Sequence, residues 1–315
     1  GWSLQGGAVL AHERLVGGTG GDHSRVNEVH LAWDGGPWQL AVGRKVLGWD
    51  VGYAFRPNDV VQQEERRTQL GQTPQGRPLL QLERFDPDRA LALVLVQPGR
   101  WRQADDAQRG AREAAVAARG YWREGALDLH AFARHGQHTG ASAGAALAWV
   151  ATDELELHAS ARAFRRHDGW SFTGPVTQPA HDNPWTQATL GGGSQWLLGA
   201  QWTGGPQLSL LAEAWHDGSA PSDALWRQWR ERGDALALLA AAPATSPQAA
   251  LRPAAAANVA WQATPMRVRV CSQPSTPMIA TVLSIISNSA TLNCMPPKTG
   301  IWPCSGGAVN DRPWA

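Results

Sequence analysis

The first 264 residues contain no cysteine, no methionine and no isoleucine. The three cysteines, the three methionines and every isoleucine of the chain lie beyond residue 264. The cysteines therefore cannot form a disulfide framework for the larger part of the chain, and their positions, 271, 294 and 304, do not have a zinc-type spacing. Because one natural domain rarely changes composition so sharply, we expect 265–315 to be a compositionally foreign tail, disordered or read in a shifted frame.

Long apolar runs are also missing, although 43% of the residues are hydrophobic. The longest run, Ala235–Ala242, stops at Pro243 and is far shorter than the ~20 residues of a membrane-spanning helix. The formal net charge is only +1, so no general attraction for nucleic acid is expected. The chain opens at Gly1 without a basic, apolar leader, and we expect a fragment of a longer protein.

What the chain does contain is regular alternation of apolar and polar residues. In 154–164, Leu and Ala occupy one set of alternate positions, whereas Glu, His, Ser and Arg occupy the other. A period of two is typical of a β-strand whose two faces meet different surroundings. The same pattern recurs at 27–43, 79–96, 125–134, 141–150 and 194–218.

The connections between these segments alternate between short and long. Short turns are expected near 34–37, 86–89, 122–125, 151–153 and 203–206. Long polar stretches are expected at about 12–24, 44–77, 98–109, 135–140, 165–187 and 217–232. This order predicts an up-and-down antiparallel meander of about twelve strands, with short turns at one rim and long loops at the other.

Two further segments have weaker patterns. Residues 111–122 are rich in alanine, but a strand is needed there to join its neighbours, so we predict a strand. Residues 221–233 predict a short loop helix that Ser222 caps and Gly233 ends.

Strand length favours a membrane protein. Several predicted strands reach about 9–11 residues, the length that crosses a bilayer when tilted, and aromatic residues cluster near the turns, as at membrane–water boundaries. The fold class is therefore all-β, an antiparallel up-and-down transmembrane β-barrel over 1–264, possibly incomplete, with a non-barrel C-terminal tail. A soluble, secreted, Trp-rich β-sandwich that binds a ligand remains the alternative, because a sandwich also alternates.

The alternation assigns side chains to faces. The candidate lumen-lining residues are Glu28, His30, Asp128, His130, Glu154, Glu156, His158, Arg162 and Glu213. The candidate aromatic girdle comprises Trp33, Trp38, Tyr121, Trp122, Trp149 and Trp202. A long loop folded into the pore would set an electric field there, and its candidate residues are Arg44, Lys45, Arg56, Asp59, Glu64, Glu65, Arg66 and Arg67.

The segment VGRKVLGWDVGYAFRPNDVV, 42–61, resembles segments of Gram-negative outer-membrane β-barrels of the porin-like kind. The features that carry the resemblance are Gly43-Arg44-Lys45, Trp49-Asp50 and the Pro57-to-Asp59 loop, and Asp50 stands where glycine is more usual in those families. The resemblance implies a protein of the cell outer membrane, in contact with its lipid bilayer and with small solutes.

No enzyme is predicted. Gly140, Ser142 and Gly144 match a nucleophile elbow, but an alternating strand follows in place of the required helix. His135 and His138 lack a third metal ligand. We therefore expect no catalytic, metal or cofactor site and no nucleic-acid partner. The predicted function is a porin-like passive channel for small solutes with a charged lumen; a plugged structural or anchor barrel is the other membrane alternative.

Overall fold

The computed structural model describes residues 1–13, 21–62, 76–100, 113–172, 184–204, 208–255, 284–287 and 290–293. Fifteen strands and one long α-helix lie in these ranges, and residues 252–255 are also helical. The strands are β1 (Trp2–Glu13), β2 (Gly21–Gly35), β3 (Trp38–Lys45), β4 (Arg77–Asp86), β5 (Arg89–Val96), β6 (Ala115–Glu124), β7 (Leu127–Gly136), β8 (Gly140–Thr152), β9 (Leu155–Phe164), β10 (His167–Phe172), β11 (Trp185–Leu190), β12 (Gly193–Gly204), β13 (Leu208–Asp217), β14 (Ser284–Ser287) and β15 (Ala290–Asn293). The helix is α1 (Asp223–Ala240), and 3-10 turns occur at η1 (Pro98–Arg100) and η3 (Ala249–Leu251).

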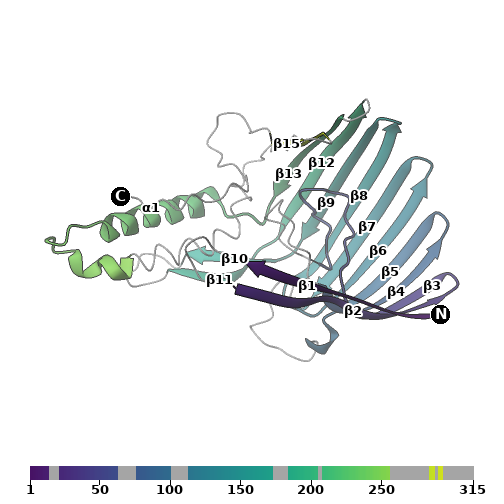
Figure 1. Ribbon diagram of the computed structural model, residues 1–315, viewed down its shortest axis with the longest axis horizontal. Coiled ribbons are helices and arrows are strands. Elements are labelled where there is room, and N and C mark those ends of the chain that lie inside the picture. The colour runs from purple at the N-terminus through teal and green to yellow at the C-terminus, as the bar shows by residue number, and fades with distance from the viewer. Residues whose placement is uncertain are drawn as a thin grey trace.

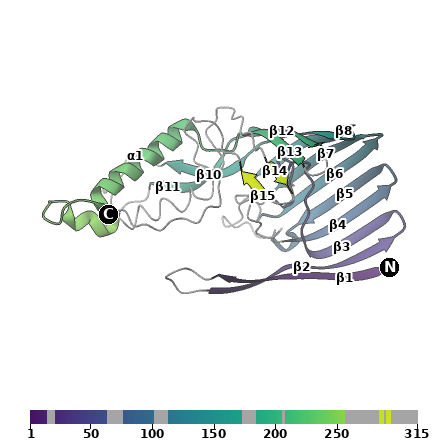
Figure 2. The same cartoon turned by 45° about the horizontal axis from the view of Figure 1, so that its top comes forward.

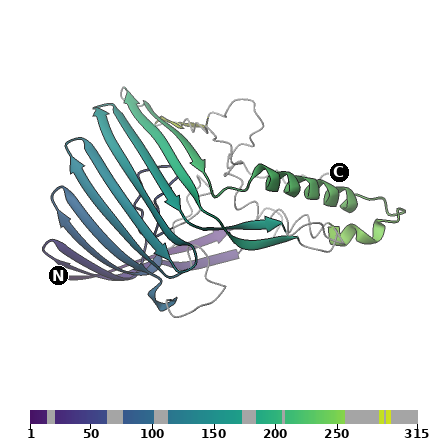
Figure 3. The same cartoon turned by 180° about the vertical axis from the view of Figure 1, so that it is seen from behind.

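The strands form one large sheet and one small hairpin (Figure 1). In the large sheet β1 to β9 follow each other in chain order, then come β12 to β15, and every neighbouring pair is antiparallel. β10 and β11 pair only with each other in the described part of the chain and lie with α1 on one side of the sheet (Figures 1 and 3). The predicted all-β, antiparallel up-and-down architecture is thereby confirmed.

The sheet curves like the wall of a trough (Figure 2). Its outermost strands, β1 and β15, are not paired with each other within the described residues, so the wall is open along one side. β14 and β15 come from the segment beyond residue 264 and add four residues each to the edge at β13.

The two rims differ as the sequence predicts. One rim carries tight turns at 36–37, 87–88, 125–126 and 153–154, where Gly36 and Gly125 have φ values of 65° and 60°, a region that glycine adopts without strain. We call it the short-turn rim. The opposite rim carries the segments that follow β3, β5, β9 and β13, and we call it the long-loop rim. The prediction of a long loop at 135–140 is wrong, because this stretch holds only a three-residue turn, 137–139, between β7 and β8.

Of the two segments with weaker sequence patterns, 111–122 agrees with its prediction and 221–233 agrees only in part. The alanine-rich stretch forms β6 as predicted, because it pairs with β5 over 115–122 and with β7 along its whole length. The loop helix begins at Ser222, whose side chain accepts a hydrogen bond from the Leu225 N–H. It does not end at Gly233 but continues to Ala240. A helical glycine costs only about 1 kcal/mol, and Leu236, one turn further on, is buried against the chain around Ala255.

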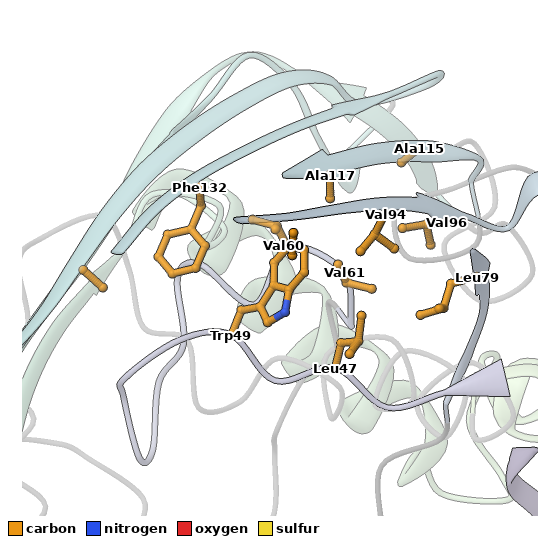
Figure 4. Packing of buried hydrophobic residues seen from close by; sticks show 12 residues of the cluster. Leu47, Trp49, Val60, Val61, Leu79, Val94, Val96, Ala115, Ala117 and Phe132 are labelled. Carbon is orange, nitrogen blue, oxygen red and sulfur yellow. The ribbon is translucent and has the colours of Figure 1, made fainter. Parts of the chain in front are cut away.

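The main hydrophobic cluster lies on the concave face, near the long-loop rim (Figure 4). One third of it comes from the connection after β3, residues 46–62, which we call the inward segment. Its Leu47, Trp49, Val60 and Val61 pack against side chains of five strands, β4 to β8. The strand residues of the cluster are Leu79, Ala92, Val94, Val96, Ala115, Ala117, Phe132 and Ala146.

Candidate lumen and inward segment

Both ends of the inward segment are fixed to the wall. At its start, the Val46 N–H donates to a carboxylate oxygen of Glu28 on β2, at 2.6 Å. At its end, the Arg77 guanidinium on β4 donates twice to the Gln62 carbonyl, at 3.1 and 3.2 Å. The segment therefore leaves and rejoins neighbouring strands and spans the concave face between these points.

Asn58 anchors the middle of the segment far across the sheet. Its Nδ2 lies 3.1 Å from the Ala145 carbonyl, 3.0 Å from the Ala161 carbonyl and 2.9 Å from Ser160 Oγ, so two N–H groups serve three acceptors on β8 and β9. Gly144 on β8 provides the space, because a Cβ there would lie 2.0 Å from Asn58 Oδ1. This glycine and the three acceptors form a socket for one side chain.

Asp50 closes the tip of the segment, residues 51–56, into a ring. Its carboxylate accepts the Val51 N–H at 2.9 Å and the Asn58 N–H at 2.5 Å, joining the two ends of 50–58. Burial raises the pKa of Asp50, while hydrogen bonds from Ser160, Asn58 and Val51 oppose that rise. The residue that departs from the usual glycine thus shapes the segment.

The tip is held to β13 by a carboxylate. The Tyr53 and Ala54 N–H groups donate to the two oxygens of Glu213, at 2.7 and 2.8 Å. His158 Nε2 on β9 lies 2.9 Å from the same carboxylate, and the Tyr53 ring meets the His158 ring edge-on at 5.4 Å. Burial raises the pKa of the Tyr53 phenol, and the nearby Glu156 carboxylate adds to the effect.

A row of polar side chains crosses β3 to β7 on the same face. Lys45 Nζ donates to Gln81 at 3.1 Å, and Gln81 donates to Glu83 at 2.6 Å. Arg119 on β6 lies 3.3 Å from His130 Nδ1 on β7. We call these five residues the polar row.

The polar row continues toward the short-turn rim through Asp128. Its carboxylate accepts the Tyr121 hydroxyl at 2.7 Å and the Arg123 guanidinium at 2.8 Å. The prediction that Tyr121 belongs to the aromatic girdle is therefore wrong. The residue lies with Asp128 and His130 on the concave face. Position 121 has the inward parity of its strand, whereas its neighbour Trp122 faces outward and is exposed.

A buried ion pair fixes the long-loop rim. Glu113 and Arg134 lie 2.7 Å apart, with side chains 0% and 2% exposed. Glu113 also accepts the His138 and Thr139 N–H groups. Burial alone would raise the pKa of Glu113, but Arg134 and the Thr139 hydrogen bonds together lower it below its usual range. We call this group the rim clamp; Gly136 beside it leaves room for the carboxylate.

Eight of the nine predicted lumen residues lie on strands at positions that point to the concave face, whereas Glu154 lies in the turn 153–154, and the nine do not form one cluster. His158 and Glu213 are in contact, with Glu156 3.8 Å from the histidine. Arg162 donates to the Pro57 carbonyl and to Ser142. His30 is buried, whereas Glu154 lies exposed at the short-turn rim. Their role in a lumen stays a prediction.

The predicted pore-loop residues have separate surroundings. Arg44 donates to the Gly76 carbonyl at 3.4 Å, and Lys45 belongs to the polar row. Arg56 donates to the Gly52 carbonyl within the tip, and Asp59 is buried. The four charges of 64–67 lie outside the described residues.

The outward face of the described sheet carries many exposed apolar side chains. Leu4, Leu91 and Leu198 are 75%, 63% and 58% exposed, and they come from β1, β5 and β12. The same face carries more exposed aliphatic side chains, namely Val29, Leu31, Val42, Leu80, Leu82, Leu93, Leu129 and Leu147.

Tryptophans gather on this face at the short-turn rim. The predicted Trp33, Trp38, Trp122, Trp149 and Trp202 all lie within a few residues of the short turns. Trp2, which the sequence did not single out, joins them opposite Trp33, with ring centroids 6.4 Å apart.

Several residues of the concave face were missed by the sequence interpretation. Arg134 and Arg119 continue the inward parity of β7 and β6, so the alternation itself could have identified them. Asn58 had no such signal, because its acceptors lie 87 to 103 residues away in the chain.

Within the described ranges, no three His, Cys, Asp or Glu side chains lie close enough together to hold a metal ion. No described helix is long and apolar enough to cross a membrane.

The sequence matches no family model and no curated protein. Among solved structures, the chain is similar to a mutant of the Rh. blastica porin, at 10% identity over 69% of this chain and 83% of that chain, with a TM-score of 0.34. A Rhodopseudomonas blastica porin triple mutant matches at 10% identity over 67% and 84%, with a TM-score of 0.33. The outer-membrane protein OmpT of Vibrio cholerae matches at 10% identity over 68% and 80%, with a TM-score of 0.33. At this level of similarity, function has to be argued from the chain's own geometry.

Proposed function

We propose that this chain forms the wall of an outer-membrane β-barrel that passes small solutes passively, and that the inward segment narrows the passage. The observation that supports this most directly is the contrast between the two faces of one sheet. Aliphatic side chains are exposed on the outward face of strands from β1 to β12, while polar and charged groups line the other face.

The outward face has the chemistry of a lipid contact. Exposed apolar patches larger than a few hundred Å² are rare on soluble monomers, and in a sandwich these rows would be buried against a second sheet. Tryptophan prefers the membrane–water boundary, so the cluster at the short-turn rim supports placing that rim at one membrane surface. Short turns face the periplasm in outer-membrane barrels and long loops face outside, which gives the orientation.

The concave face has the chemistry of a wet interior. The polar row carries two cations and one anion, Lys45, Arg119 and Glu83, and its extension adds Asp128 and Arg123. Such charges would be costly against lipid. The inward segment packs on this face against β4 to β8, so a solute would pass beside its tip and along the polar row.

One observation favours a second candidate, a plugged anchor barrel. The inward segment packs four apolar side chains tightly onto five strands, and such a contact could also seal the interior. Conductance separates the two functions.

The test has two readouts. The full chain is expressed with an outer-membrane export signal, and membrane fractions are run on a detergent gel with and without heating. We expect recovery in the outer membrane and a heat-dependent change in mobility. Purified protein in a planar bilayer is expected to give stepwise KCl conductance; a heat-modifiable protein without steps would support the plug, and a soluble protein would refute both.

A further inference from the structure

The tip of the inward segment, residues 51–56, differs from the rest of the segment in how it is held. Residues 57–62 are buried, as are Leu47 and Trp49, whereas Tyr53 and Ala54 are exposed. The bond from the Asn58 N–H to Asp50 closes the ring at its base, and the Asn58 side chain is fixed in its socket. The tip is thus a small loop that projects from a firmly anchored base.

A charged side chain of the wall, the Glu213 carboxylate, holds this projecting part. The Glu213 carboxylate accepts two consecutive N–H groups, those of Tyr53 and Ala54. The tip also has ring contacts, Phe55 on Trp215 with centroids 6.1 Å apart and Tyr53 on His158, and at its start Val51 packs against the main hydrophobic cluster. Arg56 turns back into the tip and bonds to the Gly52 carbonyl.

Gly199 and Gly52 show that this contact is built into the wall. A Cβ on Gly199 of β12 would lie 2.0 Å from His158 Nε2, so glycine makes the space in which His158 reaches Glu213. A Cβ on Gly52 would lie 2.6 Å from Leu197, so glycine also lets the tip backbone approach β12. Two glycines, one on each side, bring the carboxylate and the tip amides together.

We propose that the tip is a flap that moves as a unit about Asp50 and Asn58, and that Glu213 is the positioning residue that keeps it against β13. The proposal rests on the proposed channel function for its consequence: the flap's position sets the width of the passage. Charge-assisted hydrogen bonds to backbone N–H groups are about twice as strong as neutral ones, so Glu213 dominates the equilibrium between the held and released states.

The test compares E213Q with D217N in the full chain. Both substitutions are on β13 and remove one negative charge, but Asp217 bonds to Gln195 and Ser219 and not to the tip. A glutamine can accept only one of the two tip N–H groups well, because its amide nitrogen is itself a donor. E213D keeps a carboxylate and should therefore hold the tip better than E213Q does, so that its effects are smaller.

The first readout is amide hydrogen exchange of 51–56 in detergent, which does not depend on conduction. We expect exchange at least ~10-fold faster in E213Q than in wild type, with 57–62 and D217N unchanged. The second readout is the single-channel record, in which E213Q should show rapid current fluctuations that D217N lacks. If E213Q does not fold, Ala54→Pro removes one of the two donors from the tip itself and should have the same effects.

The outcomes distinguish the two proposals. Unchanged exchange at 51–56 in E213Q, or in Ala54→Pro, overturns the flap even if the channel conducts. Faster exchange confined to the tip supports the flap even if wild type does not conduct, in which case the channel function is the part refuted. Faster exchange throughout 46–62 also overturns the flap, because the segment would then move as a whole.

Discussion

Two connections at the long-loop rim of this molecule take opposite courses. The inward segment after β3 lies on the concave face, where it packs on β4 to β8 and is hydrogen-bonded to β8 and β9, whereas the arm after β13, residues 223–255, extends away from the sheet (Figures 1 and 3). The inward segment uses side chains of the wall as hydrogen-bond partners. The arm instead has a small core of its own, Leu236 and Ala255 with partly buried neighbours.

This difference indicates what directs a long loop onto the concave face of the sheet. Both connections contain apolar side chains, so hydrophobicity alone does not decide. The inward segment meets a wall hollowed by Gly144 and lined by groups that accept its N–H donors, while a helix satisfies its own backbone and needs only one apolar stripe covered. Position is therefore encoded in the wall as much as in the loop.

The most disruptive single change should be Gly144→Ala. The new Cβ would lie 2.0 Å from Asn58 Oδ1 and 2.4 Å from the Ala161 carbonyl, so Asn58 must leave its socket. We expect about 3 kcal/mol of destabilisation, from overpacking and from buried groups left without partners, and faster proteolysis of 46–62. Urea unfolding in detergent measures the first. Gly191→Ala is the control, because no atom lies within 4 Å of that Cβ, and equal stability of the two variants would contradict the socket.

Leu236→Ala tests the independence of the arm. Truncating this buried leucine should lower the free energy of local opening of α1 by about 2 kcal/mol, the low end for such truncations. The stability of the rest of the chain should not change. Hydrogen exchange of 225–240 should accelerate while that of 46–62 does not change. Leu238→Ala, a leucine 75% exposed on the same helix, provides the matched control. Accelerated exchange in both segments would show that the arm and the inward segment are coupled.

Acid should weaken the rim clamp. The pKa of Glu113 is lowered in the folded chain, so its ionised form contributes stability above the unfolded value of about 4.3, and this contribution is lost as pH falls through the lower folded value. We expect the urea midpoint to decline in that range with a smaller total effect than the two substitutions above. E113Q should flatten this decline; an equally steep decline in E113Q would assign it to other carboxylates.

Asp50→Asn should have the smallest effect. Burial raises the pKa of Asp50, so the folded chain binds this proton more tightly than the unfolded chain, and the residue's contribution to stability rises as pH falls through that pKa. Asparagine keeps one acceptor for the Val51 or Asn58 N–H and removes the buried charge. At neutral pH we expect a change within about 0.5 kcal/mol. A loss above about 1 kcal/mol would show that the charge itself holds the ring closed.

Local pattern was sufficient for the faces of the wall. Period-two alternation put His158 and Glu213 on one face and Leu198 on the other, and burial agrees. The strand β6 was predictable despite its alanines because a meander needs it. The end of α1 was not, because Leu236 meets Ala255 only in the folded chain.

The candidate site was less predictable than the wall. A side chain such as Asn58 reveals no partner in the sequence, since its socket is assembled from β8 and β9. The position of Tyr121 near a turn predicts a place in the girdle, but its parity within β6 points inward, and its hydroxyl lies with Asp128 on the concave face. Contacts that join distant residues follow from topology and not from local composition.

Three of the outward indoles lie against glycines of their own strand. A Cβ on Gly35, Gly120 or Gly204 would fall 2.1 to 2.4 Å from the ring of Trp33, Trp122 or Trp202, two residues away. The indole ring thus fills the space that a side chain at the glycine would need. The effect of replacing one residue therefore depends on whether the other is present. Mutational effects at these six positions should be strongly non-additive, so in any lineage that carries this sheet each glycine and its tryptophan would be gained or lost together.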